Sequence, residues 1–234
     1  MGYGRFPKYV SVAKRKEKAL RKIEKLQKKG RPVQPVTIEG RNISNTFWGK
    51  AWCDHIKNFE DYDYRLSRGR SYLRSGAVLD LSVKSGKIEA LVLGAYDYDV
   101  AISVTPLDPD LWKKIVADSM GHIDSVIELL HGKISKTIMQ KMTHVENGLF
   151  PGTGHMSFSC SCYDRADVCK HVAAALYGVG VRLDTSPEDL FTLRGVNPAD
   201  LLTKNFVDTL VQGDQDNNTL EGDLSEIFGI DLTK

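Results

Sequence analysis

The segment that decides the fold reads Met156-Ser157-Phe158-Ser159-Cys160-Ser161-Cys162-Tyr163-Asp164-Arg165-Ala166-Asp167-Val168-Cys169-Lys170-His171-Val172 and contains the pattern C-x-C-x6-C-x-H. It holds three of the four cysteines in the chain. Three thiolates and one histidine are a standard tetrahedral ligand set of structural zinc. The pattern therefore predicts one structural Zn2+ bound by Cys160, Cys162, Cys169 and His171. Because the protein fills all four positions, no position stays open for water or substrate.

The residues between the ligands predict which elements carry them. Residues 156–162 read as an extended stretch, in which a C-x-C pair points both thiols to the same side. Residues 163–168 are polar and predict a loop, whereas residues 169–177 begin a helix rich in small residues. We therefore expect one ligand pair on a strand and the other at the start of a helix.

Disulfide bonds, ordinary buried thiols and a redox-active pair are the alternatives for these cysteines. Residues 1–30 are basic and lack the apolar core of a secretory signal, which disfavours secreted-type disulfides and favours a cytoplasmic location. A redox pair is disfavoured because no C-x-x-C is present. Cys53 is isolated among hydrophobic residues and is predicted to be a core thiol. His155 precedes the strand and is a poorer ligand candidate than His171.

The ligand pattern resembles the signature of the SWIM zinc finger, and the apolar residues 172–177 look like the helix that closes it. The wider chain resembles the stand-alone bacterial SWIM zinc finger proteins in residues 47–52, 68–76 and 193–198, which are less specific motifs. The resemblance implies a zinc-stabilised module that binds DNA or other proteins. For the bacterial members it also implies an association with SNF2-like helicases.

Charge is distributed unevenly along the 234 residues. Residues 1–31 contain twelve Lys or Arg and two Glu, a net charge of +10, whereas the rest of the chain has a net charge of −8. The segment before Gly30 contains good helix formers almost throughout, and its apolar stripe is limited to Ala19, Leu20, Ile23 and Leu26. Such a cationic helix is suited to contact phosphates, where it would release counterions. Alternatively, it is a solvated helix that docks through its stripe on the acidic body.

A second basic segment, residues 67–76, contains three arginines and one tyrosine. Arginine beside an aromatic ring can grip a nucleic-acid backbone and stack on a base. The same segment is equally read as a glycine-broken turn that leads into a sheet, and we favour that interpretation. The candidate nucleic-acid contacts of the whole chain are Lys14, Arg15, Lys18, Arg21, Lys22, Lys25, Arg68, Arg70, Arg74, Arg165 and Lys170.

The remaining pattern predicts an α+β fold. Residues 31–36 form an extended linker with two prolines, and residues 48–59 have helical spacing. Residues 77–83, 88–93 and 98–104 form an antiparallel β-meander. Helices follow from Asp108 to Met142, and two proline-initiated helix starts follow residue 185.

The chain thus divides into five parts. They are a basic helical arm (1–31), a mixed α/β body (32–150), a SWIM zinc finger (151–182), a helical segment (183–212) and a flexible acidic tail (213–234). The finger is expected to be ββα-like, and the tail is rich in Asp, Asn and Gly.

The sequence contains none of the motifs that would indicate a common enzyme class. The sequence has no phosphate-cradling G-x-x-x-x-G-K-[ST], no dinucleotide fingerprint and no H-E-x-x-H. A zinc deaminase needs an open metal position and a nearby glutamate, yet no glutamate lies between Pro151 and Leu183. We therefore expect a non-enzymatic protein with no membrane span and no small-molecule substrate. The leading function is DNA binding as an accessory to a SNF2-type ATPase or DNA-processing machinery, and the alternative is a protein-interaction adaptor.

Overall fold

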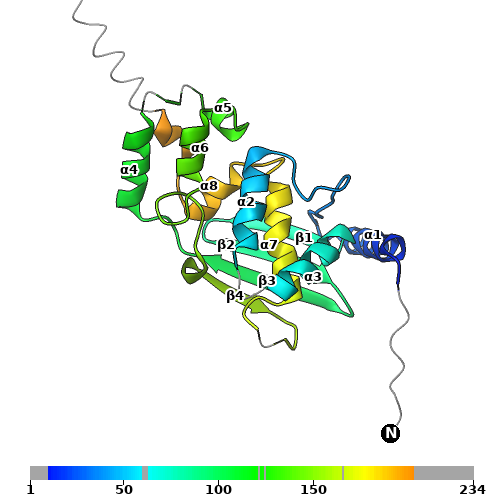
Figure 1. Cartoon of the computed structure of the whole chain (residues 1–234). Coiled ribbons are helices and arrows are strands. Elements are labelled where there is room, and N and C mark those ends of the chain that lie inside the picture. The colour runs from blue at the N-terminus through cyan, green and yellow to red at the C-terminus, as the bar shows by residue number, and fades with distance from the viewer. Residues whose placement is uncertain (1–9, 60–62, 121, 124, 165, 203–234) are drawn as a thin grey trace, which may run out of the picture.

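A four-stranded antiparallel sheet and one helix that packs on it form the centre of the computed structural model (Figure 1). The structure describes residues 10–59, 63–120, 122–123, 125–164 and 166–202. The strands lie in the order β1 (Val78–Lys84), β2 (Lys87–Leu93), β3 (Asp97–Val104) and β4 (Met156–Cys160). The predicted α+β class is therefore confirmed, as are the predicted meander and the strand that leads to the first cysteine pair.

The fourth strand joins residues 151–182 to the body. β4 pairs antiparallel with β3, so that Cys160 lies opposite Val100 and Met156 opposite Val104. The helix that follows, α7 (Lys170–Arg182), contacts all four strands. The residues that we interpreted as a finger thus share one sheet and one core with the residues interpreted as the body.

Small residues let two helices approach α7 closely. They are α2 (Phe47–Lys57) and α3 (Asp63–Arg74). A Cβ atom on Gly49 of α2 would lie 2.3 Å from the carbonyl oxygen of Gly180, and a Cβ on Gly69 of α3 would lie 2.5 Å from the Cβ of Ala173. Larger side chains at these glycines would therefore push the helices apart. The favoured interpretation of residues 67–76 as a turn is wrong, because Gly69 lies inside α3 and serves helix packing.

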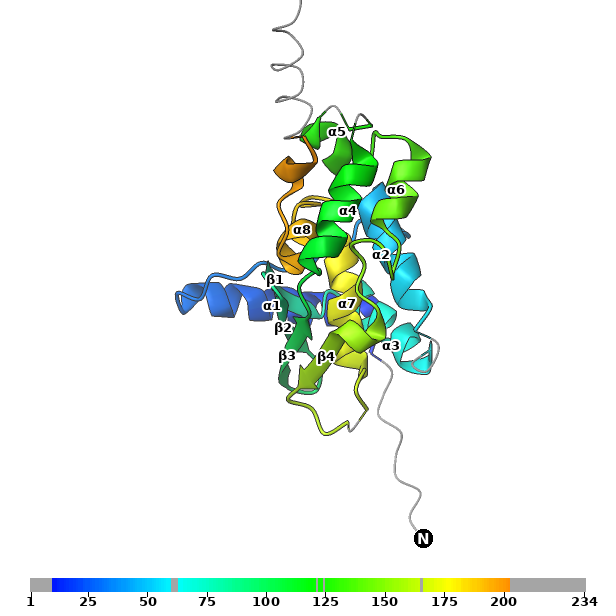
Figure 2. The ribbon, with the colours of Figure 1, turned by 90° about the vertical axis from the view of Figure 1, so that its left-hand side faces the viewer.

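The remaining helices cover one end of this core (Figure 2). They comprise α4 (Pro109–Ser119), α5 (Val126–Leu130), α6 (Lys136–Met142), α8 (Asp189–Arg194) and the short 3-10 helices η2 (Thr153–His155) and η3 (Pro198–Leu201). The indole of Trp48 donates to the carbonyl of Leu129 over 3.0 Å, and its ring meets Phe191 edge-on. These contacts join α5 and α8 to α2. No helix in the described part of the chain is long and apolar enough to cross a membrane.

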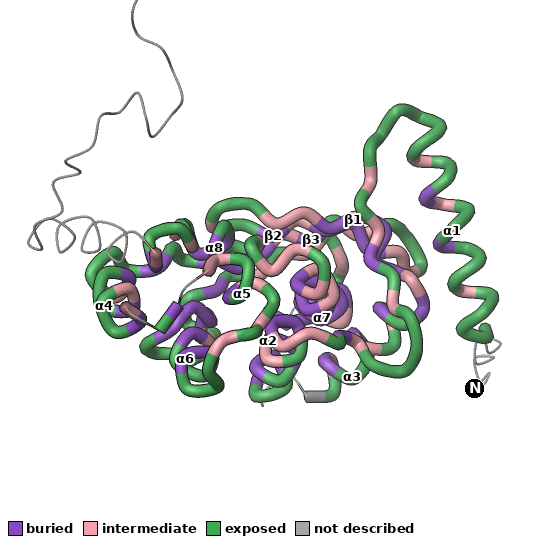
Figure 3. The backbone as a smooth tube through the Cα atoms, turned by 90° about the horizontal axis from the view of Figure 1, so that it is seen from above, coloured by how far each residue is buried: buried purple, intermediate pink, exposed green. Residues whose placement is uncertain are grey.

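The basic helix α1 (Val12–Lys28) lies at the margin of the molecule (Figure 3) and packs on the sheet face opposite α7. Its buried residues Ala19 and Ile23 form a separate small cluster with Leu79 and Leu91. A β-bulge between Val78 and Asp80 turns Leu79 toward this face, while Leu81 enters the main core. The predicted helix is confirmed.

One residue of the predicted apolar stripe does not take part in this packing. Leu20 is 57% exposed, whereas Leu26 packs against the small cluster.

The backbone reverses after α1 at Gly30, which has a φ of +77° that favours glycine. The following residues are extended, and the amide N–H of Val36 donates to the carbonyl of Val78 along the outer edge of β1.

One aspartate joins α7 to the start of α2. The carboxylate of Asp184 accepts hydrogen bonds from the hydroxyls of Ser44 and Thr46 and from the backbone N–H groups of Asn45 and Thr46. Burial alone would raise the pKa of Asp184, but these hydrogen bonds lower it overall. The charged carboxylate therefore contributes to the stability of the folded state.

We predict that Asp184→Asn lowers the free energy of unfolding by about 1–3 kcal/mol at neutral pH, because the amide replaces charge-assisted hydrogen bonds. The folded-state pKa lies below the unfolded value of about 3.9. The contribution is therefore complete above that pH and is lost as the pH falls toward the folded-state pKa. Denaturant unfolding of both proteins at neutral and acidic pH measures this, and a stability difference that stays constant on acidification would contradict it.

Candidate metal centre

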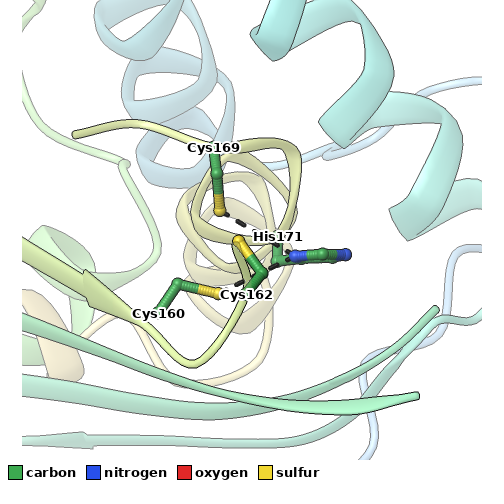
Figure 4. A group of neighbouring side chains, drawn as sticks. All are labelled: Cys160, Cys162, Cys169 and His171. Atoms are coloured by element: carbon green, nitrogen blue, oxygen red, sulfur yellow. Dashed lines mark hydrogen bonds between the residues drawn. The ribbon is translucent and has the colours of Figure 1, made fainter. Parts of the chain in front are cut away.

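The four predicted ligands converge where β4 ends and α7 begins (Figure 4). Cys160 is the last residue of β4, and Cys162 lies in the bend that follows. Cys169 is the N-cap of α7, and His171 lies in its first turn. The prediction that one ligand pair comes from a strand and the other from a helix start is confirmed for Cys160, Cys169 and His171.

The donor atoms have the spacing of a tetrahedral metal site. All four lie within 4.8 Å of one another. The Nδ1 atom of His171 is 3.7 Å from the sulfur of Cys160 and 3.9 Å from the sulfur of Cys169. A tetrahedron with metal–sulfur bonds of 2.3 Å and a metal–nitrogen bond of 2.0 Å has edges of about 3.5–3.8 Å. The four residues could therefore hold one metal ion with little rearrangement.

Hydrogen bonds at the start of α7 favour a thiolate at Cys169. The hydrogen bond that it shares with Cys160 lowers the pKa of the Cys169 thiol, and bonds from the imidazole of His171 and the backbone N–H of Val172 act in the same direction. The same shared bond raises the pKa of Cys160, which keeps the proton. A metal ion would displace that proton, because metal-bound cysteines are thiolates.

Two tyrosines enclose the imidazole of His171, which is only 1% exposed. The ring of Tyr98 stacks on it with centroids 4.1 Å apart, and the ring of Tyr72 meets it edge-on at 5.4 Å. These rings come from β3 and α3, so two further elements fix the orientation of the histidine. The sequence did not mark either tyrosine as part of the site.

A charged pair ties the loop between the ligand pairs to α3. The guanidinium of Arg65 donates to the carboxylate of Asp164 over 3.0 Å, and the same carboxylate accepts the backbone N–H of Ala166. The hydrogen bond from Arg65 is the main reason why the pKa of Asp164 is lowered.

The other candidate ligands lie outside the cluster. Cys53 is buried in α2, and burial raises the pKa of its thiol to about 12, which confirms the prediction of a core thiol. His155 lies in η2 and is exposed. His55, which the sequence analysis did not single out, is buried and bonds to the carbonyl of Pro151. Within the described residues these four ligands form the single His, Cys, Asp or Glu group with metal-binding spacing.

The predicted nucleic-acid contacts of the arm mostly lie on the outer side of α1. Lys14, Lys18, Arg21 and Lys25 are exposed, and Arg15 and Lys22 are partly buried at its flanks. Arg21 pairs with Glu17, and Lys22 pairs with Asp97 at the start of β3.

The predicted contacts on α3 have different surroundings. Arg68 lies over the ring of Tyr64 at 5.5 Å and is exposed. Arg70 donates to the hydroxyl of Tyr177, and Arg74 donates to the carbonyl of Arg41, so both already make contacts within the protein. Lys170 is half-buried at the start of α7. Arg165 and the predicted tail (213–234) lie outside the described residues.

The chain is similar to a mycobacterial protein. The chain is 33% identical over 182 residues to a Mycobacterium tuberculosis (strain ATCC 25618 / H37Rv) protein described as "Uncharacterized protein Rv2102". The match covers 73% of this chain and 65% of that protein. No protein-family model matches the chain, and no solved structure matches it. The description of this relative names no activity.

We predict that Cys169→Ser reduces the metal content of the purified protein from one ion per chain to nearly none and unfolds α7. Metal binding in such sites contributes on the order of 10 kcal/mol, which rivals the stability of a whole domain. Elemental analysis and circular dichroism measure the two effects. Cys53→Ser is the matched control, because it removes the remaining cysteine and leaves all four ligands in place. Retention of the ion by Cys169→Ser with unchanged thermal stability would contradict the assignment of Cys169 as a metal ligand.

Proposed function

We propose that this chain is a nucleic-acid-binding protein, with DNA as its ligand, that is stabilised by a SWIM-type zinc site. The observation that carries the proposal is the position of α1. This helix packs on the sheet through Ala19 and Ile23 and carries a row of exposed cations on its opposite side. The protein thus presents a folded basic surface and not merely a charged sequence.

Zinc is the metal that fits the ligand set best. Three thiolates and one imidazole with tetrahedral spacing match its closed structural sites, whereas magnesium and calcium prefer oxygen ligands. With all four positions filled by protein, the ion would hold β4 and α7 together and would not activate water. This role agrees with the buried, aromatic surroundings of His171.

The exposed cations of α1 form one row along the helix. They recur every three or four residues, on the side away from the buried residues, at Lys14, Lys18, Arg21, Lys25 and Lys28. From first to last the row covers about 21 Å at 1.5 Å per residue. One strand of duplex DNA carries a phosphate about every 3.4 Å, so about six phosphates span the same length. Among the described residues, only Arg21 of this row forms an ion pair.

An exposed aromatic ring lies beside this row. Tyr96, in the turn between β2 and β3, is 72% exposed and borders a surface depression together with Lys18, Arg21 and Lys25. Aromatic rings next to cations are typical of surfaces that stack a base and neutralise its phosphate. Tyr96 and the row of cations come from segments about 70 residues apart in the sequence, and the fold brings them together.

The resemblance to stand-alone bacterial SWIM proteins extends the proposal to a partner. We propose that the protein acts beside a SNF2-type ATPase or other DNA-processing machinery, as those proteins are thought to do.

The alternative function is that of a protein-interaction adaptor without direct nucleic-acid contact. A groove of about 400 Å³ between α4 and α6, at the end of the molecule away from α1, favours this alternative because it exposes apolar side chains such as Leu111. Nuclease-resistant co-purification with an ATPase would support the adaptor.

We predict that the combined variant Lys18→Gln, Arg21→Gln and Lys25→Gln binds DNA much more weakly than the unaltered chain. Each lost phosphate contact reduces the slope of log affinity against log salt by about 0.9, so the slope on duplex DNA becomes shallower by about 2.7. Fluorescence anisotropy with single- and double-stranded DNA, in salt from roughly 50 to 200 mM, measures this. These substitutions keep α1 in place, whereas deletion of the helix would expose Leu79 and Leu91.

The control for this variant removes three other exposed lysines at the opposite end of the molecule, by Lys114→Gln, Lys133→Gln and Lys136→Gln. It makes the same change in net charge. Equal weakening by both triple variants would mean that affinity follows overall charge and not α1. No DNA binding by the unaltered chain at low salt would refute the proposal and favour the adaptor.

A further inference from the structure

A cleft of about 390 Å³ lies between α2 and α3, both of which pack on α7 (Figure 1). The segment that leads into α2, residues 41–44, also lines it. The carboxylate of Asp54 in the cleft pairs with Lys57. The other charged groups of the lining have no ion-pair partner among the described residues. All of them are cations, and they are Arg41, Lys50, Arg70 and Arg74.

This concentration of positive charge differs from the rest of the body, because residues 32–234 carry a net charge of −8. The carboxylate of Asp184 reaches the cleft at Ser44, but its oxygens accept hydrogen bonds from Ser44, Asn45 and Thr46 and do not pair with these cations. Unpaired cations that converge on one cleft repel one another. Such a local conflict is expected where side chains serve binding and not folding. A bound anion would offset the repulsion.

A buried tyrosine holds one of these cations in place. The guanidinium of Arg70 donates to the hydroxyl of Tyr177 over 3.0 Å and lies over its ring at 5.6 Å. Tyr177 belongs to α7 and is fully buried, so its position is fixed by the core. The bond uses one of the five N–H donors of Arg70, which leaves the guanidinium able to bind an oxyanion. Because Arg70 is already ordered, binding would cost less side-chain entropy.

A second arginine of the cleft is also held by the protein. Arg74 donates to the backbone carbonyl of Arg41 over 3.1 Å, which joins the last turn of α3 to the segment before α2. Cations from α2, from α3 and from the segment before α2 thus surround one hollow. The site is assembled by the tertiary fold and not by a single helix.

The lining of the cleft fits the backbone of a nucleic acid better than its bases. Arginine, lysine, asparagine and serine side chains are the ones that contact phosphates and sugars, and all four types are present. The described residues that line the cleft include no aromatic ring on which a base could stack. Contacts of this kind carry no direct sequence information. We therefore expect the cleft to bind phosphate groups independently of base sequence.

The cleft and α1 are neighbours on the surface of the protein. Arg74 lines the cleft, and Gly76, two residues later, lies against α1, where a Cβ atom would be 3.8 Å from the Cβ of Ala19. Two residues of backbone span at most about 7 Å. A nucleic acid bound along the cations of α1 would therefore reach the cleft across the end of α3.

We propose that the cleft between α2 and α3 is a second phosphate-binding surface, in which Lys50, Arg70 and Arg74 bind the backbone of the nucleic acid. This inference rests on the proposed function, because it names a second place at which the same nucleic acid is held. It assigns to α3 a direct role in binding, in addition to its packing on α7.

The test is DNA binding by the zinc-loaded full chain with the double substitution Lys50→Gln and Arg74→Gln. Both side chains are exposed, so the fold should be retained, and thermal unfolding checks this. The loss of two phosphate contacts should make the slope of log affinity against log salt shallower by about 1.8 and lower the affinity about tenfold or more near 0.1 M salt. Fluorescence anisotropy with two duplexes of unrelated sequence measures both effects, which should be equal for the two duplexes.

The matched control is the double substitution Lys133→Gln and Lys136→Gln, which removes two exposed lysines at the opposite end of the molecule. It should leave the slope unchanged. Equal weakening by both double variants would overturn the proposal, because affinity would then follow overall charge.

The remaining outcomes separate the cleft from the proposed function. If the α1 triple variant weakens DNA binding and the cleft double variant does not, the cleft proposal fails and the proposed function stands. If the cleft variant loses affinity for inorganic tripolyphosphate, measured by calorimetry, but not for DNA, the cleft is a site for a small phosphate ligand and the proposed occupant is wrong. No DNA binding by the unaltered chain at low salt would overturn both proposals.

Discussion

The structure depends on the junction between the end of β4 and the start of α7. Cys160 ends the strand, and Cys169 and His171 begin the helix, so a metal ion bound there would join the edge of the sheet to its central helix. α7 is rich in alanine and glycine, and α2 and α3 approach it closely enough that Gly49 and Gly69 leave no room for a side chain. A helix of small residues buries little apolar area per residue. A metal ion that fixes the position of α7 would therefore contribute more to stability here than in a helix of large side chains.

The sheet separates the two roles that we assign to the chain. One face packs on α7 and the metal ligands, and the other receives α1 through a β-bulge that turns Leu79 outward. Only a few contacts hold α1, among them the ion pair between Lys22 and Asp97. Docking by apolar residues leaves most of its cations unpaired. This explains why the positive charge of the helix is not neutralised by the sheet on which it packs.

Local patterns were predictable from the sequence, and long-range partners were not. The ligand set was predictable because its members lie within twelve residues, and β1, β2 and β3 because a period of two is a local signal. The helical state of residues 67–74 was missed because Gly69 indicates a helix break until Ala173 is known to pack against it. The tyrosines around His171 and the carboxylate of Asp184 act across 70 to 140 residues of sequence. No spacing rule connects such residues.

The most direct test of the account is native-state hydrogen exchange of the full chain before and after removal of its metal by a chelator. If the junction governs the fold, metal removal should abolish the protection of backbone amides in α7 and β4 and lower it in α3, which packs on α7. Amides of α4 and α6, at the other end of the molecule, should retain more of their protection. Unchanged protection of α7 in the metal-free protein would contradict the claim that the metal centre positions the central helix.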